Sequence, residues 1–457
     1  MGKYFGTDGF RGEANCNLTA DHAFKVGRFL GWYYTQLKRR SGSDGSARIV
    51  IGKDTRRSSY MFEYSLVGGL VASGADAYLL HVTTTPSVAF VVRTEGFDCG
   101  IMISASHNPY YDNGIKLINN FGEKMDESVI SLVEAYLDGN LEAFGRKWEE
   151  LPLAKRDQIG RTVDHVAGRN RYIGYLISLG MYSFKGVKVG LDCANGSSWN
   201  IAKCVFDALG AKTYVINAAP DGYNINQNAG STHIEVLQRY VVENGLDVGF
   251  AYDGDADRCL AVDERGRVVD GDQILYVCGV YLNKHGRLSG GTVVPTIASN
   301  FGLIKSLELA GLSAVTSGVG DRHVYAKMRE GGYSLGGEQT GHTIFGDIER
   351  TGDGIMTSLR VMEVIRAERE TLSQLTAPCK LLPQAQVAVR VADKDAALEN
   401  MGVQNAIAEA EAALAGEGRV LVRKSGTESV IRVLAEAPDQ ASADAAMKRI
   451  ANALEAL

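Results

Sequence analysis

Short apolar stretches of strand length alternate with longer stretches of helical periodicity along most of this chain. The first helical pattern starts after Thr19, whose hydroxyl suits a helix cap, and it places Ala23, Val26 and Leu30 on one face. The next expected elements are a strand at 48–51, a helix at 58–73 and a strand at 77–82. This β-α-β order predicts a mainly parallel sheet with helices on its faces.

The alternation returns twice more, which predicts an α/β fold with three similar units in series. The second round has a strand from residue 185, a helix at 199–209 and strands at 212–216 and 247–251; the third has a strand at 292–295, a helix at 302–309 and a strand at 314–316. After a helix at 354–370, an Ala- and Glu-rich tail predicts a smaller α+β domain. The expected domains are 1–155, 156–252, 253–370 and 371–457.

Length, charge and cysteine use narrow the class of protein. A chain of 457 residues has room for three or four domains of about 100–150 residues each. The formal net charge of −6 argues against nucleic acid as a partner, although a local cluster of Arg and Lys is enough to bind a small anion. The seven cysteines are scattered without a CxxC pair, which predicts reduced thiols in the cytoplasm. No apolar run approaches the roughly 20 residues of a membrane helix, and the first residues have no signal-peptide pattern, so no membrane partner is expected.

The first candidate for chemistry is the end of an apolar strand at 100–103. The chain there continues through Ser104-Ala-Ser-His-Asn-Pro109, which presents Ser106 at a strand tip with His107 beside it and Lys116 a short loop away. Functional residues of open α/β sheets collect where strands end in this way. On this stretch alone, an ordinary strand-to-turn corner is an equally good interpretation.

The second candidate is the acidic loop Asp253-Gly-Asp-Ala-Asp-Arg258. Asp253, Asp255 and Asp257 can converge on one divalent cation, and Mg²⁺ is favoured because three protein oxygens leave positions for water and a phosphate oxygen. Glu264 fits the last position of an EF-hand loop, but Arg258 stands where that loop needs glycine. A solvated acidic turn is the other alternative, although three carboxylates repel one another without a cation among them.

Two glycine-containing turns complete the set of candidates. Arg423-Lys-Ser-Gly-Thr427 offers freed backbone N–H groups, two hydroxyls and a guanidinium, as an oxyanion site requires. Gly337-Glu-Gln-Thr-Gly-His342 offers a carboxylate and a hydroxyl that suit vicinal sugar hydroxyls. Each turn read by itself also fits a plain surface loop, as does the segment that holds Thr7, Asp8 and Arg11.

Ser106 and His107 form a poor hydrolase pair. Adjacent residues of an extended chain point to opposite faces, and no G-x-S-x-G nucleophile motif surrounds Ser106. A hydroxyl that is combined with a metal loop, Lys116 and a separate phosphate site indicates phosphoryl transfer, which depends on positioning and charge neutralisation.

Taken together, five motifs resemble the α-D-phosphohexomutase family over essentially the whole chain. They are Tyr4-Phe-Gly-Thr-Asp-Gly-Phe-Arg-Gly12, Ser104-Ala-Ser-His-Asn-Pro109, Asp253-Gly-Asp-Ala-Asp-Arg258, Gly337-Glu-Gln-Thr-Gly-His342 and Arg423-Lys-Ser-Gly-Thr-Glu428. The resemblance implies four domains around one cleft, with three α/β units and a C-terminal α+β domain. Gln339 and the opening motif point to the branch that acts on glucosamine phosphates.

The resemblance also implies roles for individual residues. Ser106 would carry the transferred phosphate and act as a metal ligand, and Asp253, Asp255 and Asp257 would be the other ligands of Mg²⁺. Lys116 and Arg11 would border the reacting phosphate. His107 and His342 would be candidates for proton transfer. The substrate would be bound by Arg258, Glu338, Thr340, His342, Arg423, Ser425, Gly426 and Thr427. The implied reaction interconverts glucosamine 6-phosphate and glucosamine 1-phosphate through a 1,6-bisphosphate, which supplies amino-sugar precursors for UDP-N-acetylglucosamine and cell-wall synthesis.

Two departures from the pattern of this branch leave the sugar preference open. Thr340 stands where Ser is usual, and Ser429 stands where Pro is usual. A phosphoglucomutase or phosphomannomutase of the same family is therefore the alternative. A phosphosugar sensor would have lost the nucleophile or a metal ligand, and a phosphatase would release free phosphate. The sequence does not determine the oligomeric state, for which a homodimer is one candidate.

Overall fold

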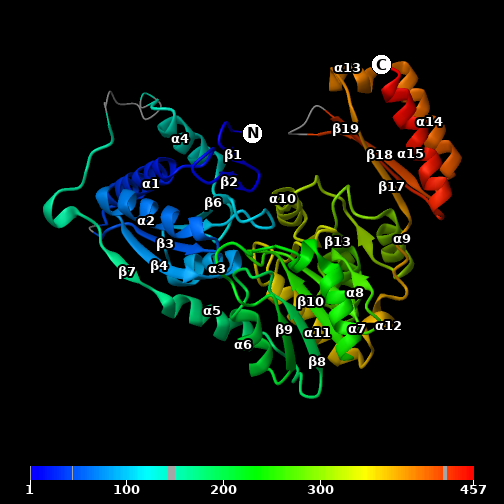
Figure 1. The fold of residues 1–457 in the computed structure, drawn as a ribbon, viewed down its shortest axis with the longest axis horizontal. Helices are drawn as coiled ribbons and strands as arrows, with labels where there is room; N and C mark the ends of the chain where they lie inside the picture. The colour runs from blue at the N-terminus through cyan, green and yellow to red at the C-terminus, as the bar shows by residue number, and fades with distance from the viewer. Residues whose placement is uncertain (1, 44, 141, 143–149, 426–429) are drawn as a thin grey trace.

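The computed structural model describes residues 2–43, 45–140, 142, 150–425 and 430–457. This part of the chain forms four β-sheets, one in each of four successive units. Figure 1 shows the first unit in blue and cyan, the next two in green to yellow, and the C-terminal unit in orange and red at one corner. None of the described helices is long and apolar enough to cross a membrane.

The first unit contains a seven-stranded mixed sheet. Its strands are β1 (Phe5–Gly6), β2 (Gly9–Glu13), β3 (Arg48–Lys53), β4 (Asp76–Val82), β5 (Cys99–Ile103), β6 (Asp112–Asn119) and β7 (Thr162–Asp164), and its helices are α1 (Ala20–Arg40), α2 (Arg57–Ala72), α3 (Thr85–Glu95) and α4 (Glu127–Leu137). The strand order is β1-β2-β6-β5-β3-β4-β7, with β3 parallel to β4 and β5 as the sequence predicts. The Thr19 hydroxyl accepts a hydrogen bond from the His22 N–H, which confirms the predicted helix cap.

The second and third units repeat this α/β arrangement. The second has β8 (Lys188–Asp192), β9 (Lys212–Ile216), β10 (Val248–Tyr252), β11 (Cys259–Asp263), β12 (Val268–Val269), α5 (Val166–Ser178), α6 (Ile201–Ala208) and α7 (Ile234–Asn244). The third has β13 (Thr292–Val294), β14 (Ser313–Ala314), β15 (Leu335–Gly337), β16 (Thr343–Phe345), α8 (Gly271–Lys284), α9 (Phe301–Leu309), α10 (Asp321–Gly331), α11 (Gly354–Glu368) and α12 (Leu372–Thr376). The sheet orders are β12-β11-β10-β8-β9 and β14-β13-β15-β16.

The C-terminal unit is the predicted smaller α+β domain. It has β17 (Gln384–Arg390), β18 (Arg419–Lys424), β19 (Val430–Glu436), α13 (Lys394–Glu399), α14 (Met401–Leu414) and α15 (Gln440–Glu455). The three strands form an antiparallel sheet in the order β17-β19-β18. Short 3₁₀ turns elsewhere in the chain are Arg156–Gln158, Gly230–Thr232 and Ser289–Gly291.

Three motifs of the sequence occupy corresponding hairpins in the three α/β units. In each α/β sheet one parallel strand is followed directly by an antiparallel neighbour, which forms the pairs β5–β6, β10–β11 and β15–β16. These three hairpins carry Ser106, the acidic loop 253–258 and the loop 338–342 in turn. In the C-terminal unit, the described residues of the fourth motif, 423–425, lie at the end of β18. The internal repeat therefore places one candidate loop at the same position in each of the three α/β units.

Two sheets extend past the boundaries expected from the sequence. β7 pairs with β4, so the first sheet includes residues beyond 155. β11 and β12 belong to the sheet of β10, so the second sheet continues past 252 to Val269. A boundary within the acidic loop would separate two paired strands, and we therefore place the end of the second unit after Val269.

The apolar cores join three of the units and leave the fourth separate. One continuous buried cluster includes Phe90 of α3, Tyr172 of α5, Phe206 of α6 and Ile355 of α11. The C-terminal unit has its own cluster, and polar contacts tie it to the third unit. Among these, the Asn300 side chain exchanges two hydrogen bonds of 2.9 Å with the Leu382 backbone.

Glycines allow α1 and α2 to pack closely against each other. A Cβ at Gly27 of α1 would lie 2.3 Å from the Leu66 carbonyl oxygen of α2. Helix backbones that approach this closely have no room for a methyl group. Gly68, on the same helix pair, is different, because a Cβ there would lie 3.7 Å from the Phe24 ring, at ordinary contact distance.

We expect Gly27→Ala to lower the free energy of unfolding by about 1–3 kcal/mol, because the added methyl forces the helices apart. Gly68→Ala is the matched control, and it should raise stability by up to about 1 kcal/mol through helix propensity alone. The measurement is the urea midpoint followed by circular dichroism. Equal midpoints for the two variants would contradict this description of the helix contact.

Candidate active site

Ser106 lies at the corner between β5 and β6 and is fully buried. Its φ of 53° falls in the left-handed region, which residues other than glycine rarely adopt. The Ser106 carbonyl oxygen accepts hydrogen bonds from Arg56 Nη2 (3.1 Å) and Asn226 Nδ2 (2.8 Å). The same two side chains also donate to the Asn108 carbonyl oxygen. Residues of two units thus hold a strained backbone in place, an arrangement that is common at functional sites.

The Ser106 hydroxyl faces the acidic loop of the second unit. It donates a hydrogen bond to Asp253 Oδ2, although the two residues are 147 positions apart in the sequence. A Cβ on the next residue, Gly254, would lie 2.5 Å from the Ser106 carbonyl oxygen. Glycine at this position therefore lets the β5–β6 and β10–β11 hairpins meet.

Asp253, Asp255 and Asp257 form a buried carboxylate triad. Their ligand oxygens lie within 4.8 Å of one another. Burial, followed by the charges of Asp257 and Asp255, raises the pKa of Asp253 well above its usual value. Among the described residues, Asp255 Oδ1 and Asp257 Oδ1 have no hydrogen-bond partner. Buried carboxylate oxygens that lack donors and converge in this way fit a divalent cation with oxygen ligands.

Lys116 brings a buried positive charge to the triad. Its Nζ lies 2.7 Å from Asp255 Oδ2 and 3.4 Å from Asp257 Oδ2. Burial alone would lower the pKa of Lys116, but the surrounding carboxylates raise it above the usual value, so the ammonium stays charged. For Asp257, burial would raise the pKa, but Lys116, His342 and Arg258 together hold it below the usual value.

His107 and Arg258 lie on another side of the same cluster. Arg258 Nη1 is 3.3 Å from His107 Nδ1, and the Arg258 N–H donates to Asp253 Oδ1 (3.2 Å). Burial, together with the charges of Arg258 and Arg11, lowers the pKa of His107 to about 4. His107 is therefore uncharged at neutral pH, with Nδ1 accepting from the guanidinium. Arg11 forms an ion pair with Asp8 at the turn between β1 and β2.

The β15–β16 hairpin brings the predicted sugar-binding side chains to the edge of this cluster. Glu338 Oε1 accepts a hydrogen bond from the Gly320 N–H (2.9 Å), which joins the hairpin to the start of α10. Thr340 is exposed at the tip. Gln339 lies outside the cluster, because its side chain bonds Asp270 (3.2 Å) in front of α8.

His342 closes the cluster from the third unit. Its ring is almost fully buried, with Nδ1 3.9 Å from Asp257 Oδ2 and Nε2 3.7 Å from Asp321 Oδ2. The Gly352 N–H points at Nε2 (3.0 Å), so Nε2 acts as an acceptor and the proton is assigned to Nδ1.

The fourth motif lies on a separate unit. Arg423 is half-buried on β18 opposite Arg432 of β19, and the buried Ser425 receives a Lys394 hydrogen bond on its carbonyl oxygen (2.8 Å). Gly426 and Thr427, also expected in this site, lie outside the described residues. In Figure 1 the C-terminal unit stands beside α9, apart from the helices of the first unit.

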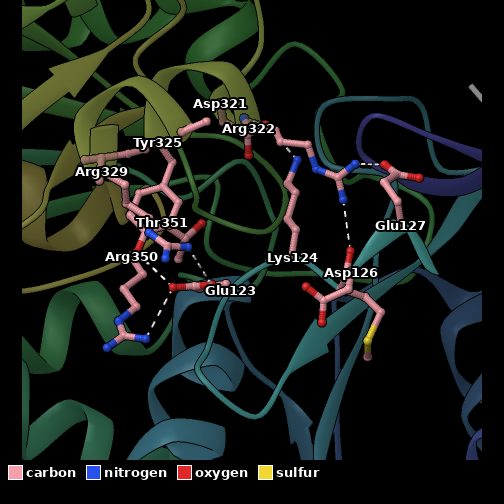
Figure 2. Close-up of a pocket in the computed structure, with 13 residues that line it drawn as sticks. Glu123, Lys124, Asp126, Glu127, Asp321, Arg322, Tyr325, Arg329, Arg350 and Thr351 are labelled. Atoms are coloured by element: carbon pink, nitrogen blue, oxygen red, sulfur yellow. Dashed lines mark hydrogen bonds and ion pairs between the residues drawn. The ribbon is translucent and has the colours of Figure 1, made fainter. Parts of the chain in front are cut away.

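Other residues of the cluster carry no recognisable motif. Lys124, in the segment between β6 and α4, contacts Asp8 Oδ1 (3.2 Å) and Asp321 Oδ1 (2.7 Å). Figure 2 shows Lys124 reaching across to Asp321 at the edge of a pocket of about 300 Å³ between the first and third units. Arg56 and Asn226, which hold Ser106, also lie in segments without a spacing signal. Asp8 belongs to the opening motif at 4–12, and the position of Arg56 shortly after β3 is the hint that the sequence offers for that residue.

Family models match the chain in four consecutive segments. Their descriptions are Phosphoglucomutase/phosphomannomutase alpha/beta/alpha domain I (residues 2–143), domain II (170–266), domain III (270–381) and the C-terminal domain (387–453). The four matched segments follow the four units of the structure in order.

Named relatives cover nearly the whole chain. A phosphoglucosamine mutase of Lachnospira eligens is 62% identical over 437 residues, which are 96% of this chain and 95% of that protein. A phosphoglucosamine mutase of Anoxybacillus flavithermus is 46% identical, with coverage of 99% and 98%.

Solved structures share the fold. A phosphoglucomutase/phosphomannomutase family protein of Burkholderia thailandensis is 22% identical and has a TM-score of 0.79, with coverage of 100% of this chain and 98% of that one. An Aspergillus fumigatus N-acetylphosphoglucosamine mutase, solved in complex with GlcNAc-6P and magnesium, is 20% identical with a TM-score of 0.66, over 99% and 95% of the two chains. The matched segments and the close relatives show that this chain belongs to the phosphoglucomutase/phosphomannomutase family.

Proposed function

We propose that this chain is a mutase that interconverts glucosamine 6-phosphate and glucosamine 1-phosphate. The observation that carries the proposal is the buried Ser106 hydroxyl bonded to Asp253 inside a carboxylate triad. The close relatives named phosphoglucosamine mutase support the same reaction. The cytoplasm is the compartment expected for such an enzyme, and a homodimer remains a prediction.

Ser106 carries the phosphoryl group in this proposal. Asp253, Asp255 and Asp257 would hold Mg²⁺ together with that group, and the ion would supply charge neutralisation. Lys116 and Arg11 add positive charge at the border of the reacting group. The Lys116 ammonium contacts two of the carboxylates, so the protein itself neutralises part of their negative charge.

The remaining side chains hold the sugar and the phosphate that does not react. Glu338 and Thr340 would bind sugar hydroxyls, with His342 and Arg258 beside them. Arg423, Ser425, Gly426 and Thr427 would bind the second phosphate from the C-terminal unit. This phosphate site lies on a unit with its own apolar core. A separate unit suits a reaction in which first one phosphate of the substrate and then the other is bound there.

The reaction then has two phosphoryl transfers. In the first, the sugar O1 attacks phospho-Ser106, the O1–P bond forms, the Ser106 Oγ–P bond breaks, and the O1 proton passes to the freed serine oxygen. After the 1,6-bisphosphate turns over, Ser106 Oγ takes the phosphoryl group from O6, and O6 takes the proton. His107 and His342 are the candidate proton carriers; His107 is a weak base because of its low pKa.

A phosphoglucomutase or phosphomannomutase remains the second candidate because Thr340 replaces the usual serine of the glucosamine branch. Initial rates on glucosamine 6-phosphate, glucose 1-phosphate and mannose 1-phosphate decide between them. We expect the largest kcat/KM for glucosamine 6-phosphate. A preference for a neutral hexose would overturn the proposed substrate.

We predict that Ser106→Ala abolishes turnover and keeps the fold, because the variant has no oxygen to carry the phosphoryl group. Intact-protein mass spectrometry before and after phosphatase treatment checks this. The wild-type protein should lose the mass of one phosphoryl group, and Ser106→Ala should carry none. Ser131→Ala, an exposed serine of α4, is the control and should retain both the phosphoryl group and the activity. Substantial mutase activity in Ser106→Ala would disprove the assignment.

We also predict that Mg²⁺ stabilises the wild-type protein. At a concentration 100-fold above its Kd, the ion should add about 2.7 kcal/mol to the free energy of unfolding. Asp255→Asn should remove this response in a thermal unfolding experiment, because it deletes one ligand of the triad. Asp263→Asn, which changes a buried carboxylate at the end of β11 that is paired with Arg267 in the following turn, should keep it. Insensitivity of the wild-type protein to Mg²⁺ would contradict the metal assignment.

A further inference from the structure

Six side chains form a closed ring of alternating acids and bases around the candidate site. Starting at the metal loop, the ring runs through Asp257, Lys116, Asp8, Lys124, Asp321 and His342 and returns to Asp257. Successive members are 2.7–3.9 Å apart. The first unit supplies three of them, the metal loop one and the third unit two.

Each carboxylate of the ring lies beside at least one cationic side chain. Asp257 and Asp8 are both in contact with Lys116, and Asp8 is also in contact with Lys124 and Arg11. Asp321 forms an ion pair with Lys124, an ammonium group that it shares with Asp8.

Only one oxygen of Asp321 is engaged with donors in the part of the chain that the structure describes. Oδ1 accepts from Lys124 Nζ (2.7 Å) and from the Arg322 N–H (2.8 Å). Oδ2 faces His342 Nε2 at 3.7 Å, which is itself an acceptor. Lys124 has no donor left for Oδ2, because its other contacts are the Thr7 carbonyl oxygen (2.9 Å) and Asp8. Oδ2 therefore presents an acceptor that lacks a donor.

Asp321 lies next to the group proposed to hold the sugar. It directly follows Gly320, whose N–H binds Glu338 Oε1. Figure 2 shows Asp321 at the rim of the pocket, where Lys124 approaches it from the first unit. A sugar hydroxyl held by Glu338 would therefore be bound beside Gly320, the residue that precedes Asp321.

We propose that Asp321 recognises the protonated 2-amino group of the substrate and so selects the amino sugar over a neutral hexose. This inference rests on the proposed function. An aliphatic ammonium offers three donors and a positive charge, which match the carboxylate charge of Asp321 and its Oδ2, the oxygen that lacks a donor among the described residues. A 2-hydroxyl lacks that charge, so its hydrogen bond to a carboxylate is weaker.

The test measures the Kd of glucosamine 6-phosphate and of glucose 6-phosphate by calorimetry, together with turnover. Asp321→Asn keeps the size of the side chain and removes its charge. We expect the preference for glucosamine 6-phosphate over glucose 6-phosphate to fall about 10-fold or more, the range for a charge-assisted hydrogen bond. The KM for glucosamine 6-phosphate should rise more than its kcat falls.

Two further variants separate recognition from a structural role. Lys124→Met breaks the same ion pair and keeps the carboxylate, so the preference for the amino sugar should not fall. Glu330→Gln removes a carboxylate from the same helix, where it pairs with Lys327 at the surface, and should leave the preference unchanged. Equal weakening of both sugars by Asp321→Asn, or the same loss of preference in Lys124→Met, would overturn this inference. The proposed function fails separately, if the wild-type protein does not turn over glucosamine 6-phosphate at all.

Discussion

The structure depends on the balance of charge around three carboxylates that are buried together. Asp253, Asp255 and Asp257 repel one another in a medium that solvates them poorly, and so they require cations in fixed places. Lys116 from the first unit and Arg258 from the loop itself supply part of that charge. The charge of these carboxylates is therefore partly neutralised where the β5–β6 hairpin of the first unit contacts the β10–β11 hairpin of the second. The same need explains why the candidate site lies between units rather than within one.

The internal repeat makes this convergence simple to build. Each α/β unit contributes the hairpin that joins a parallel strand to its antiparallel neighbour, and the three hairpins differ only in what they carry. One carries the Ser106 hydroxyl, one the carboxylates and one the loop at 338–342. A single architecture, used three times with different loops, thereby assembles a site that no unit contains alone.

Sequence reasoning found the parts of the site that follow a readable strand. Ser106 and the acidic loop come directly after apolar strands, and their residue types already indicate phosphate and metal chemistry. It did not find the link between Lys124 and Asp321, because these residues are 197 positions apart and neither belongs to a motif. The extent of each sheet was not predicted for a related reason. Whether β11 and β12 join the second or the third sheet depends on strand pairing, which local patterns do not encode.

The left-handed backbone of Ser106 restricts which residues evolution can try at that position. A β-branched side chain is strained at a φ of 53°, and Ser106 is fully buried among neighbouring residues. Threonine carries the same hydroxyl chemistry, yet it does not fit this backbone. The backbone at position 106 thus favours serine over threonine, although both side chains carry a hydroxyl.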